Sequence, residues 1–250
     1  MLKLTLIAGL ALFLGAKYLP HAGSWLGLRS RKTFRQAKWM WSWVAGSEAE
    51  SLQAEREYGR ECAREFAAQF SGRSARDNQE VVASVGSRLA AAVDDPRRQF
   101  QFTVVVAPTA NAFALPGGFV FITEALVDLC EHDEGELAFF LGHEMAHVLR
   151  GHAKDQVTAS AFLNAVTARL TGAGLMLRQV LAKGYSRDLE LEADREGARL
   201  AAAAGFDSRA AVRGLRRLAQ ASAGSARLLE YFSSHPPLAE RLQRLDRASS

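Results

Sequence analysis

The spacing of apolar positions divides the chain into helical stretches on either side of one short extended region. Apolar residues recur at helical intervals over 48–70 and over about 80–93, where Asp94-Asp95-Pro96 ends the second pattern. From residue 124 onward the pattern is helical again. It predicts helices at 124–131, 134–152, 155–182 (with a break near 172–174), 187–203, 208–221 and 237–246.

The extended region lies between these two groups of helices. Residues 99–106, QFQFTVVV, alternate and then become β-branched, which predicts a strand. Residues 111–123 predict two short extended pieces around a turn at Pro116-Gly117-Gly118. The sequence therefore predicts an α+β fold that is mainly helical and contains one small sheet.

Charge is distributed unevenly along the chain. Residues 1–47 carry seven basic side chains and no acidic one, although the formal net charge of the whole chain is only +4. The other residues carry 24 basic and 27 acidic groups, so their net charge is −3. The main domain therefore lacks the excess of basic groups that nucleic-acid binding requires, and we expect no nucleic-acid partner.

The N-terminal segment has the composition of a membrane-targeting sequence. An uncharged apolar run of 13 residues extends from Leu4 to Ala16. This length suits a signal peptide, and residues 2–19 as a helix of about 27 Å marginally span a bilayer if Lys17 reaches the headgroups. The small-residue pattern of a cleavage site is poor. We therefore expect residues 1–19 to be a membrane anchor or a signal sequence, with an uncleaved anchor favoured.

Residues 20–47 have a different composition from the anchor. All four tryptophans fall within residues 25–43, among five basic side chains. Tryptophan beside lysine and arginine is typical of a segment at the membrane interface that contacts lipids, although these rings could instead pack on the following domain. The expected organisation is therefore an anchor or signal (1–19), a basic interface segment (20–47) and one domain (48–250).

The two cysteines do not indicate a compartment. Cys62 and Cys130 are far apart and lack the spacing of a metal site. A single disulfide and two buried free thiols both remain open.

The stretch LGHEMAHV carries the clearest chemistry in the chain. His143 and His147 are four residues apart on a predicted helix, so both imidazoles project from one face and can bind one Zn²⁺. Glu144 lies on the flank of that face, where it can act as a general base without binding the metal. Two spectator histidines on an exposed helix are the alternative. The apolar neighbours oppose it, because burying such groups without partners costs several kcal/mol.

A hydrolytic zinc site needs a third protein ligand. The best candidate lies in YSRDLELEADREG, where Glu190 and Asp194 are again four residues apart. We predict that Glu190 binds the metal and that Asp194 accepts the free N–H of a ligand histidine. Glu192 and Glu196 are assigned to a solvated helix face, and His152 is assigned a structural role.

Taken together, these motifs resemble the gluzincin metallopeptidases of peptidase family 48. HEMAH followed by SRDLELEAD matches the family's H-E-x-x-H and E-x-x-x-D pair, and NAFALPGGFVFITEAL and SSHPPLAERL also fit. The resemblance covers roughly residues 48–246. Since the chain lacks several membrane spans, it is most similar to the single-domain Oma/BepA-like branch.

The resemblance implies a zincin domain whose small sheet lies beside the active-site helix, with one Zn²⁺ per chain. It implies that the edge strand at Asn111, Ala112, Phe113 and Ala114 pairs with an extended substrate. It also implies a catalytic role for His235, which would either stabilise the oxyanion or cap the metal.

We therefore expect a membrane-associated zinc metalloendopeptidase of the cell envelope, with the periplasmic side favoured. Its partners would be misfolded or damaged envelope proteins and, through the N-terminus, membrane lipids. Two alternatives remain. One is a latent protease that acts mainly as a chaperone-like binding module, and the other is a zinc hydrolase of non-peptide substrates.

Overall fold

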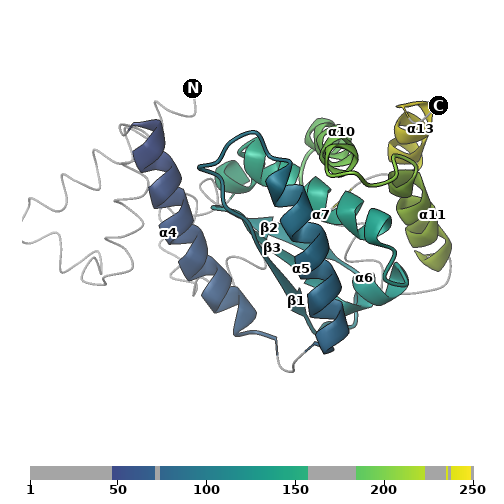
Figure 1. The fold of residues 1–250 in the computed structure, drawn as a ribbon, viewed down its shortest axis with the longest axis horizontal. Helices are drawn as coiled ribbons and strands as arrows, with labels where there is room; N and C mark the ends of the chain where they lie inside the picture. Colours follow the sequence, from purple (N-terminus) through teal and green to yellow (C-terminus); the bar gives the residue numbers. More distant parts are fainter. Residues whose placement is uncertain (1–46, 71–73, 157–183, 223–234, 236–237, 249–250) are drawn as a thin grey trace, which may run out of the picture.

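The computed structural model describes residues 47–70, 74–156, 184–222, 235 and 238–248 (Figure 1). The helices are α4 (Glu48–Ala67), α5 (Arg76–Ala91), α6 (Glu124–Leu129), α7 (Glu134–Leu149), α10 (Arg187–Ala203), α11 (Ala210–Ser222) and α13 (Leu238–Ala248). The strands are β1 (Gln101–Val105), β2 (Ala112–Leu115) and β3 (Phe119–Thr123). The predicted α+β fold, mainly helical with one small sheet, is confirmed.

The sheet has the order β1-β3-β2. β1 pairs with β3 in parallel, and β2 pairs with β3 in antiparallel register, with Ala112 opposite Ile122 and Leu115 opposite Phe119. The two predicted extended pieces are thus a hairpin. Within the described residues β2 pairs on one side only, so it forms an edge of the sheet.

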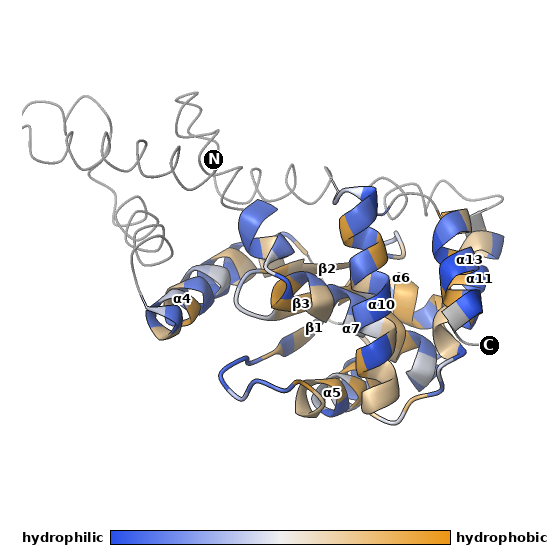
Figure 2. Ribbon diagram, turned by 90° about the horizontal axis from the view of Figure 1, so that it is seen from above, coloured by the Kyte–Doolittle hydropathy of each residue, from blue (hydrophilic) through white to orange (hydrophobic). Residues whose placement is uncertain are grey.

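Helices cover both faces of this sheet (Figure 1). In β3, Phe119 and Phe121 join a cluster with Phe66 of α4, whereas Val120 and Ile122 join the larger core that contains α5 and α7. Every residue of β2 and β3 is buried, and both strands are coloured as apolar in Figure 2. The sheet is therefore sandwiched, which holds β2 at a fixed position next to α7.

Helices α7 and α10 cross backbone to backbone at Gly142 and Gly197. A Cβ atom added to Gly142 would lie 2.8 Å from the Gly197 carbonyl oxygen, and one added to Gly197 would lie 2.6 Å from the His143 nitrogen. Only glycine permits this approach. The crossing places the HEMAH motif of α7 directly against the first turns of α10.

Helix α7 ends earlier than the sequence predicts. The pattern predicted one helix over 134–152, but α7 ends at Leu149 and Gly151 adopts φ +79°. Residues 152–156 then form a new helical turn. Apolar spacing does not detect this break, because Gly151 interrupts the backbone without interrupting the apolar pattern.

Some predictions fall outside the described residues. These are the anchor or signal (1–19), the basic interface segment (20–47, apart from Ser47) and nearly all of the predicted helix 155–182. Within the part of the chain that is described, no helix is both long enough and apolar enough to cross a membrane. Cys62 and Cys130 are buried free thiols in different core clusters, so the structure favours the unpaired alternative.

Candidate metal centre

The two histidines of HEMAH face each other inside the protein. His143 and His147 are 2% and 0% exposed, and their Nε2 atoms are 3.1 Å apart. Asp133 caps the N-terminus of α7 by accepting a hydrogen bond from the Glu136 amide. The helix is therefore fixed at its start, and its i, i+4 spacing directs both rings to one point.

Helix α10 brings a carboxylate to the same point. Glu190 is 1% exposed, and its oxygens lie 3.5 Å from His143 Nε2 and 3.4 Å from His147 Nε2. Its Oε1 atom is buried and has no hydrogen-bond partner among the described residues. Such an orphaned acceptor costs free energy unless a further group satisfies it.

His235 completes this group of side chains. Its Nδ1 lies 2.9 Å from Glu190, and the ring is 3% exposed. Ligand atoms of His143, His147, Glu190 and His235 all lie within 4.8 Å of one another. Nitrogen and oxygen donors at this spacing fit Zn²⁺, whose bonds to such ligands are about 2.0–2.2 Å long. A cation would also satisfy the orphaned oxygen of Glu190.

The electrostatics of the centre favour a positive charge. Burial works to lower the pKa of His143, but hydrogen bonds with Asp194 and Glu190 raise it to about 9. Burial lowers the pKa of His147 to about 3. Burial works to raise the pKa of Glu190, yet His235 and the two facing imidazoles hold it well below its usual range. The carboxylate thus stays ionised, as a metal ligand must be.

Asp194 lies one turn beyond Glu190 and holds the far side of His143. Its Oδ1 is 3.0 Å from His143 Nδ1, which leaves Nε2 directed at the centre. Arg241 of α13 donates to both oxygens of Asp194, from Nε at 2.8 Å and from Nη2 at 2.7 Å. Burial works to raise the pKa of Asp194, but this guanidinium lowers it to about 2.

Sequence reasoning missed Arg241. It is 1% exposed and is the largest fully buried side chain among the described residues. Its only sequence signal was its place six residues after His235, within the SSHPPLAERL stretch. A charged residue is normally assigned to the solvated face of an amphipathic helix, so periodicity alone hides it.

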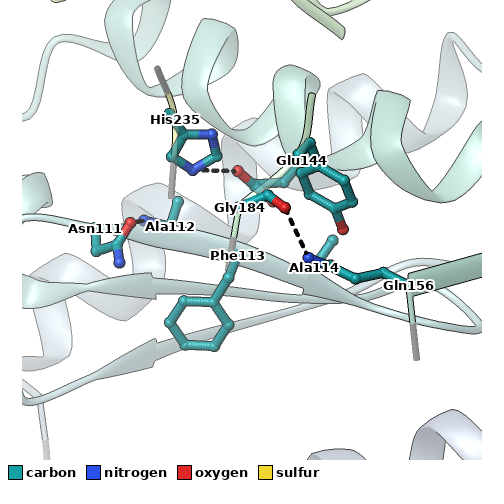
Figure 3. A pocket seen from close by; sticks show the side chains of 9 residues that line it. Asn111, Ala112, Phe113, Ala114, Glu144, Gln156, Gly184 and His235 are labelled. Carbon is teal, nitrogen blue, oxygen red and sulfur yellow. Dashed lines mark hydrogen bonds and ion pairs between the residues drawn. The ribbon is translucent and has the colours of Figure 1, made fainter. Parts of the chain in front are cut away.

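Glu144 lies beside the donor group and lines a pocket with β2 (Figure 3). It is 2% exposed, and its carboxylate lies 3.7 Å from His235 Nε2. Burial raises the pKa of Glu144, against the opposing charges of His235 and His143. The glutamate is therefore not one of the clustered donors and lines the pocket beside them, as a general base requires.

The other side of the pocket is the predicted substrate strand. Asn111, Ala112, Phe113 and Ala114 all line it, together with Tyr185, Gln156 and Gly184. Asn111 anchors the strand, since its amide donates to the Thr123 hydroxyl at 2.9 Å and its side-chain oxygen accepts from the Ala112 amide. Phe113 packs under α4, which ties the strand to the opposite face of the sheet.

Two acids on α10 are less solvated than expected. Glu196 is only 14% exposed at its side chain and pairs with both Arg150 and Arg199. Glu192 is 34% exposed and lies 3.4 Å from Arg150. The assignment of Glu196 to a solvated face is therefore wrong, because ion pairs cover most of its side chain.

This combination of fold and buried donors is that of a zincin-type peptidase domain. Comparison with known families agrees, since the profile of Peptidase family M48 matches residues 76–249. The chain belongs to peptidase family M48, as the motifs predicted. The match leaves out α4, although this helix covers one face of the sheet.

Several curated proteins are similar to this chain. The mitochondrial metalloendopeptidase OMA1 of Schizosaccharomyces pombe is 33% identical over 156 residues, which cover 59% of this chain and 46% of that protein. The metalloprotease YcaL of Escherichia coli is 33% identical over 162 residues, which cover 60% of this chain and 62% of that protein. A Vibrio cholerae protein named as a beta-barrel assembly-enhancing protease is 32% identical over 180 residues, which cover 64% of this chain and 35% of that protein. The matched residues thus make up between about one third and two thirds of the length of each of these relatives.

Proposed function

We propose that this chain is a zinc-dependent metalloendopeptidase. The observation that carries the proposal is the buried donor group of His143, His147 and Glu190, in which two Nε2 atoms and an unsatisfied carboxylate oxygen converge. A bound cation would offset the cost of burying these donors together and would satisfy the free carboxylate oxygen. Membership of a peptidase family and the names of the relatives support the assignment.

In this proposal His143, His147 and Glu190 hold one Zn²⁺. The chemistry that such an ion supplies is Lewis-acid polarisation of the substrate carbonyl and acidification of a water molecule. Asp194 accepts the Nδ1–H of His143 and so keeps the Nε2 lone pair directed at the centre.

Glu144 is the proposed general base and acid. From its place between the donor group and β2, its carboxylate takes a proton from the attacking water and returns it to the leaving nitrogen. His235 lies 3.7 Å from Glu144 and 2.9 Å from Glu190, where it assists catalysis or caps the metal.

Strand β2 explains why the substrate would be a polypeptide. It is an edge strand of the described sheet and lines the pocket over residues 111–114, so an extended chain can pair with its main chain. Ala112 and Ala114 belong to the cluster on the α7 side, and their small side chains leave room next to Glu144. A zinc hydrolase of non-peptide substrates has no need of such an edge.

A latent protease is the second candidate, and His235 favours it. Its imidazole lies within the donor group and could complete the coordination of the metal. A latent enzyme would bind zinc yet cleave only after His235 moves away, so His235→Ala would raise cleavage. In the catalytic alternative the same substitution lowers it.

For the cellular context, we propose a membrane-associated protease of the cell envelope, on the periplasmic side, that removes misfolded or damaged proteins. The apolar run of 4–16 and the tryptophans and cations of 25–43 support lipid contact through the N-terminus. Deleting residues 1–45 keeps every proposed ligand and all of α4. We expect the truncated protein to be soluble and active. If it still sediments with membranes, attachment lies elsewhere in the chain.

The proposal as a whole is tested by metal analysis and casein cleavage. Purified protein should contain about one zinc per chain. A chelator should abolish cleavage, and added zinc should restore it. Metal-free protein that cleaves casein as fast as the zinc-loaded protein would overturn the assignment.

A further inference from the structure

We propose that His152 and Glu192 are positioning residues that fix the tautomer and direction of His147. The inference rests on the proposed zinc site and deepens it. It assigns a role in metal binding to a histidine beyond the H-E-x-x-H motif and to a glutamate at an unspecified position of the E-x-x-x-D motif.

The contact between the two histidines determines which nitrogen carries each proton. His147 Nδ1 lies 3.1 Å from His152 Nδ1, and both rings are buried. For Nε2 of His147 to offer its lone pair at the centre, its Nδ1 must carry the proton and donate it. His152 Nδ1 is then the acceptor, so its own proton is on Nε2.

A carboxylate lies near the nitrogen that carries this second proton. His152 Nε2 lies 3.6 Å from Glu192, which also lies 3.4 Å from Arg150. Each ring nitrogen in the series from Glu192 through His152 to His147 therefore has one defined role. Asp194 and Arg241 serve His143 in a comparable way, so each ligand histidine is held at Nδ1 by its own partners.

The break at Gly151 makes this contact possible. In a continuous helix a residue five positions beyond His147 would be rotated by about 140° from it and would face away. Because α7 ends at Leu149 and Gly151 adopts φ +79°, the chain turns back and His152 reaches the His147 ring. The contact is therefore built by the backbone at a fixed position.

Tyr185 restrains the same ring from its face. Its ring stacks on His147 with centroids 3.8 Å apart and planes at 14°. The stacking fixes the plane of the imidazole, while the hydrogen bond to His152 fixes its direction within that plane. Together they leave His147 one orientation.

The test measures zinc affinity of the full chain by competition with a chelator, alongside thermal unfolding of the zinc-free protein. His152→Ala should weaken zinc binding by about 10–100-fold. His152→Asn places an amide oxygen where Nδ1 was, so it should keep affinity within about threefold of the wild type. Glu192→Gln should weaken binding by less than about tenfold, because Glu192 is partly exposed.

Glu196→Gln is the matched control for Glu192. It lies on the same helix and also pairs with Arg150, but the carboxylate near His152 Nε2 belongs to Glu192. Its zinc affinity should be unchanged. In the His152→Asn background, Glu192→Gln should have no further effect, because the imidazole Nε2–H that lies near Glu192 is gone.

Three results would overturn the inference alone. The first is an unchanged zinc affinity in His152→Ala. The second is an equal loss of zinc affinity in His152→Ala and His152→Asn that follows their unfolding temperatures. The third is an equal loss of zinc affinity in Glu192→Gln and Glu196→Gln. Wild-type protein that binds no zinc would overturn the proposed function and this inference with it.

Discussion

Replacing Arg241 by Met removes a buried charge while keeping a side chain of similar length. In the folded protein Arg241 is 1% exposed and donates to both oxygens of Asp194. After the substitution the Asp194 carboxylate stays buried, with His143 as its remaining hydrogen-bond partner among the described residues. The variant therefore leaves a buried anion without its main counter-charge.

The burial of this pair sets the size of the effect. Removing one partner of a buried ion pair costs about 3–5 kcal/mol, whereas an exposed pair contributes about 0–1 kcal/mol. For a domain of about 200 residues, each kcal/mol shifts the melting temperature by about 2–4 °C. We therefore expect the Arg241→Met variant to melt roughly 6–20 °C below the wild type.

The assay is thermal unfolding of chelator-treated protein, followed by circular dichroism. Arg244→Met is the matched control, because Arg244 lies on the same helix and its exposed side chain pairs with Glu240. It should change stability by less than about 0.5 kcal/mol. Adding Asp194→Asn to Arg241→Met removes the orphaned charge and should recover part of the loss.

Two outcomes would refute this reasoning. If Arg241→Met is no less stable than Arg244→Met, the buried pair does not stabilise the fold. If the double variant loses as much as the sum of the two single variants, the two side chains do not act on each other.

Three further predictions concern the site and the cysteines. Glu144→Gln should keep zinc bound while cleavage falls by at least about a hundredfold, the scale of a lost general base; retained activity would remove Glu144 from the mechanism. Glu190→Ala should lose zinc and Glu196→Ala should keep it, as metal analysis of the two proteins will show. Burial raises the pKa of Cys62 to about 12 and also raises that of Cys130. A thiol reagent at pH 8 should therefore label both only after unfolding, and labelling of the native protein would contradict their burial.

The local parts of the site could be predicted from the sequence. His143, Glu144 and His147 lie on one helix, so their relation follows from helical geometry alone. The hairpin of β2 and β3 follows from alternation and a glycine turn. Glu190 was harder, because acidic pairs four residues apart are common on solvated helices. The need for a third ligand and the spacing to Asp194 suggested it, and the motif resemblance supported that choice.

The supporting residues could not be predicted, for two physical reasons. Arg241 is a charged side chain on a buried helix face, which reverses the rule by which helix faces are assigned. His152 reaches His147 only because the helix breaks at Gly151, and apolar spacing carries no record of that break. The first contact depends on tertiary structure, and the second depends on a local turn of the backbone.

The glycine crossing of α7 and α10 has a consequence for the ion that can bind. Main-chain contact at Gly142 and Gly197 sets the gap between the helix that carries the histidines and the helix that carries Glu190. Zn²⁺ needs four donors at about 2.0–2.3 Å, whereas Ca²⁺ needs six to eight oxygens at about 2.3–2.6 Å. The donors held across this crossing are imidazole nitrogens and one carboxylate, a set that suits Zn²⁺ and offers too few oxygens for Ca²⁺. A side chain at either glycine would force the two helices apart and carry Glu190 away from the histidines, although neither glycine contacts an ion itself.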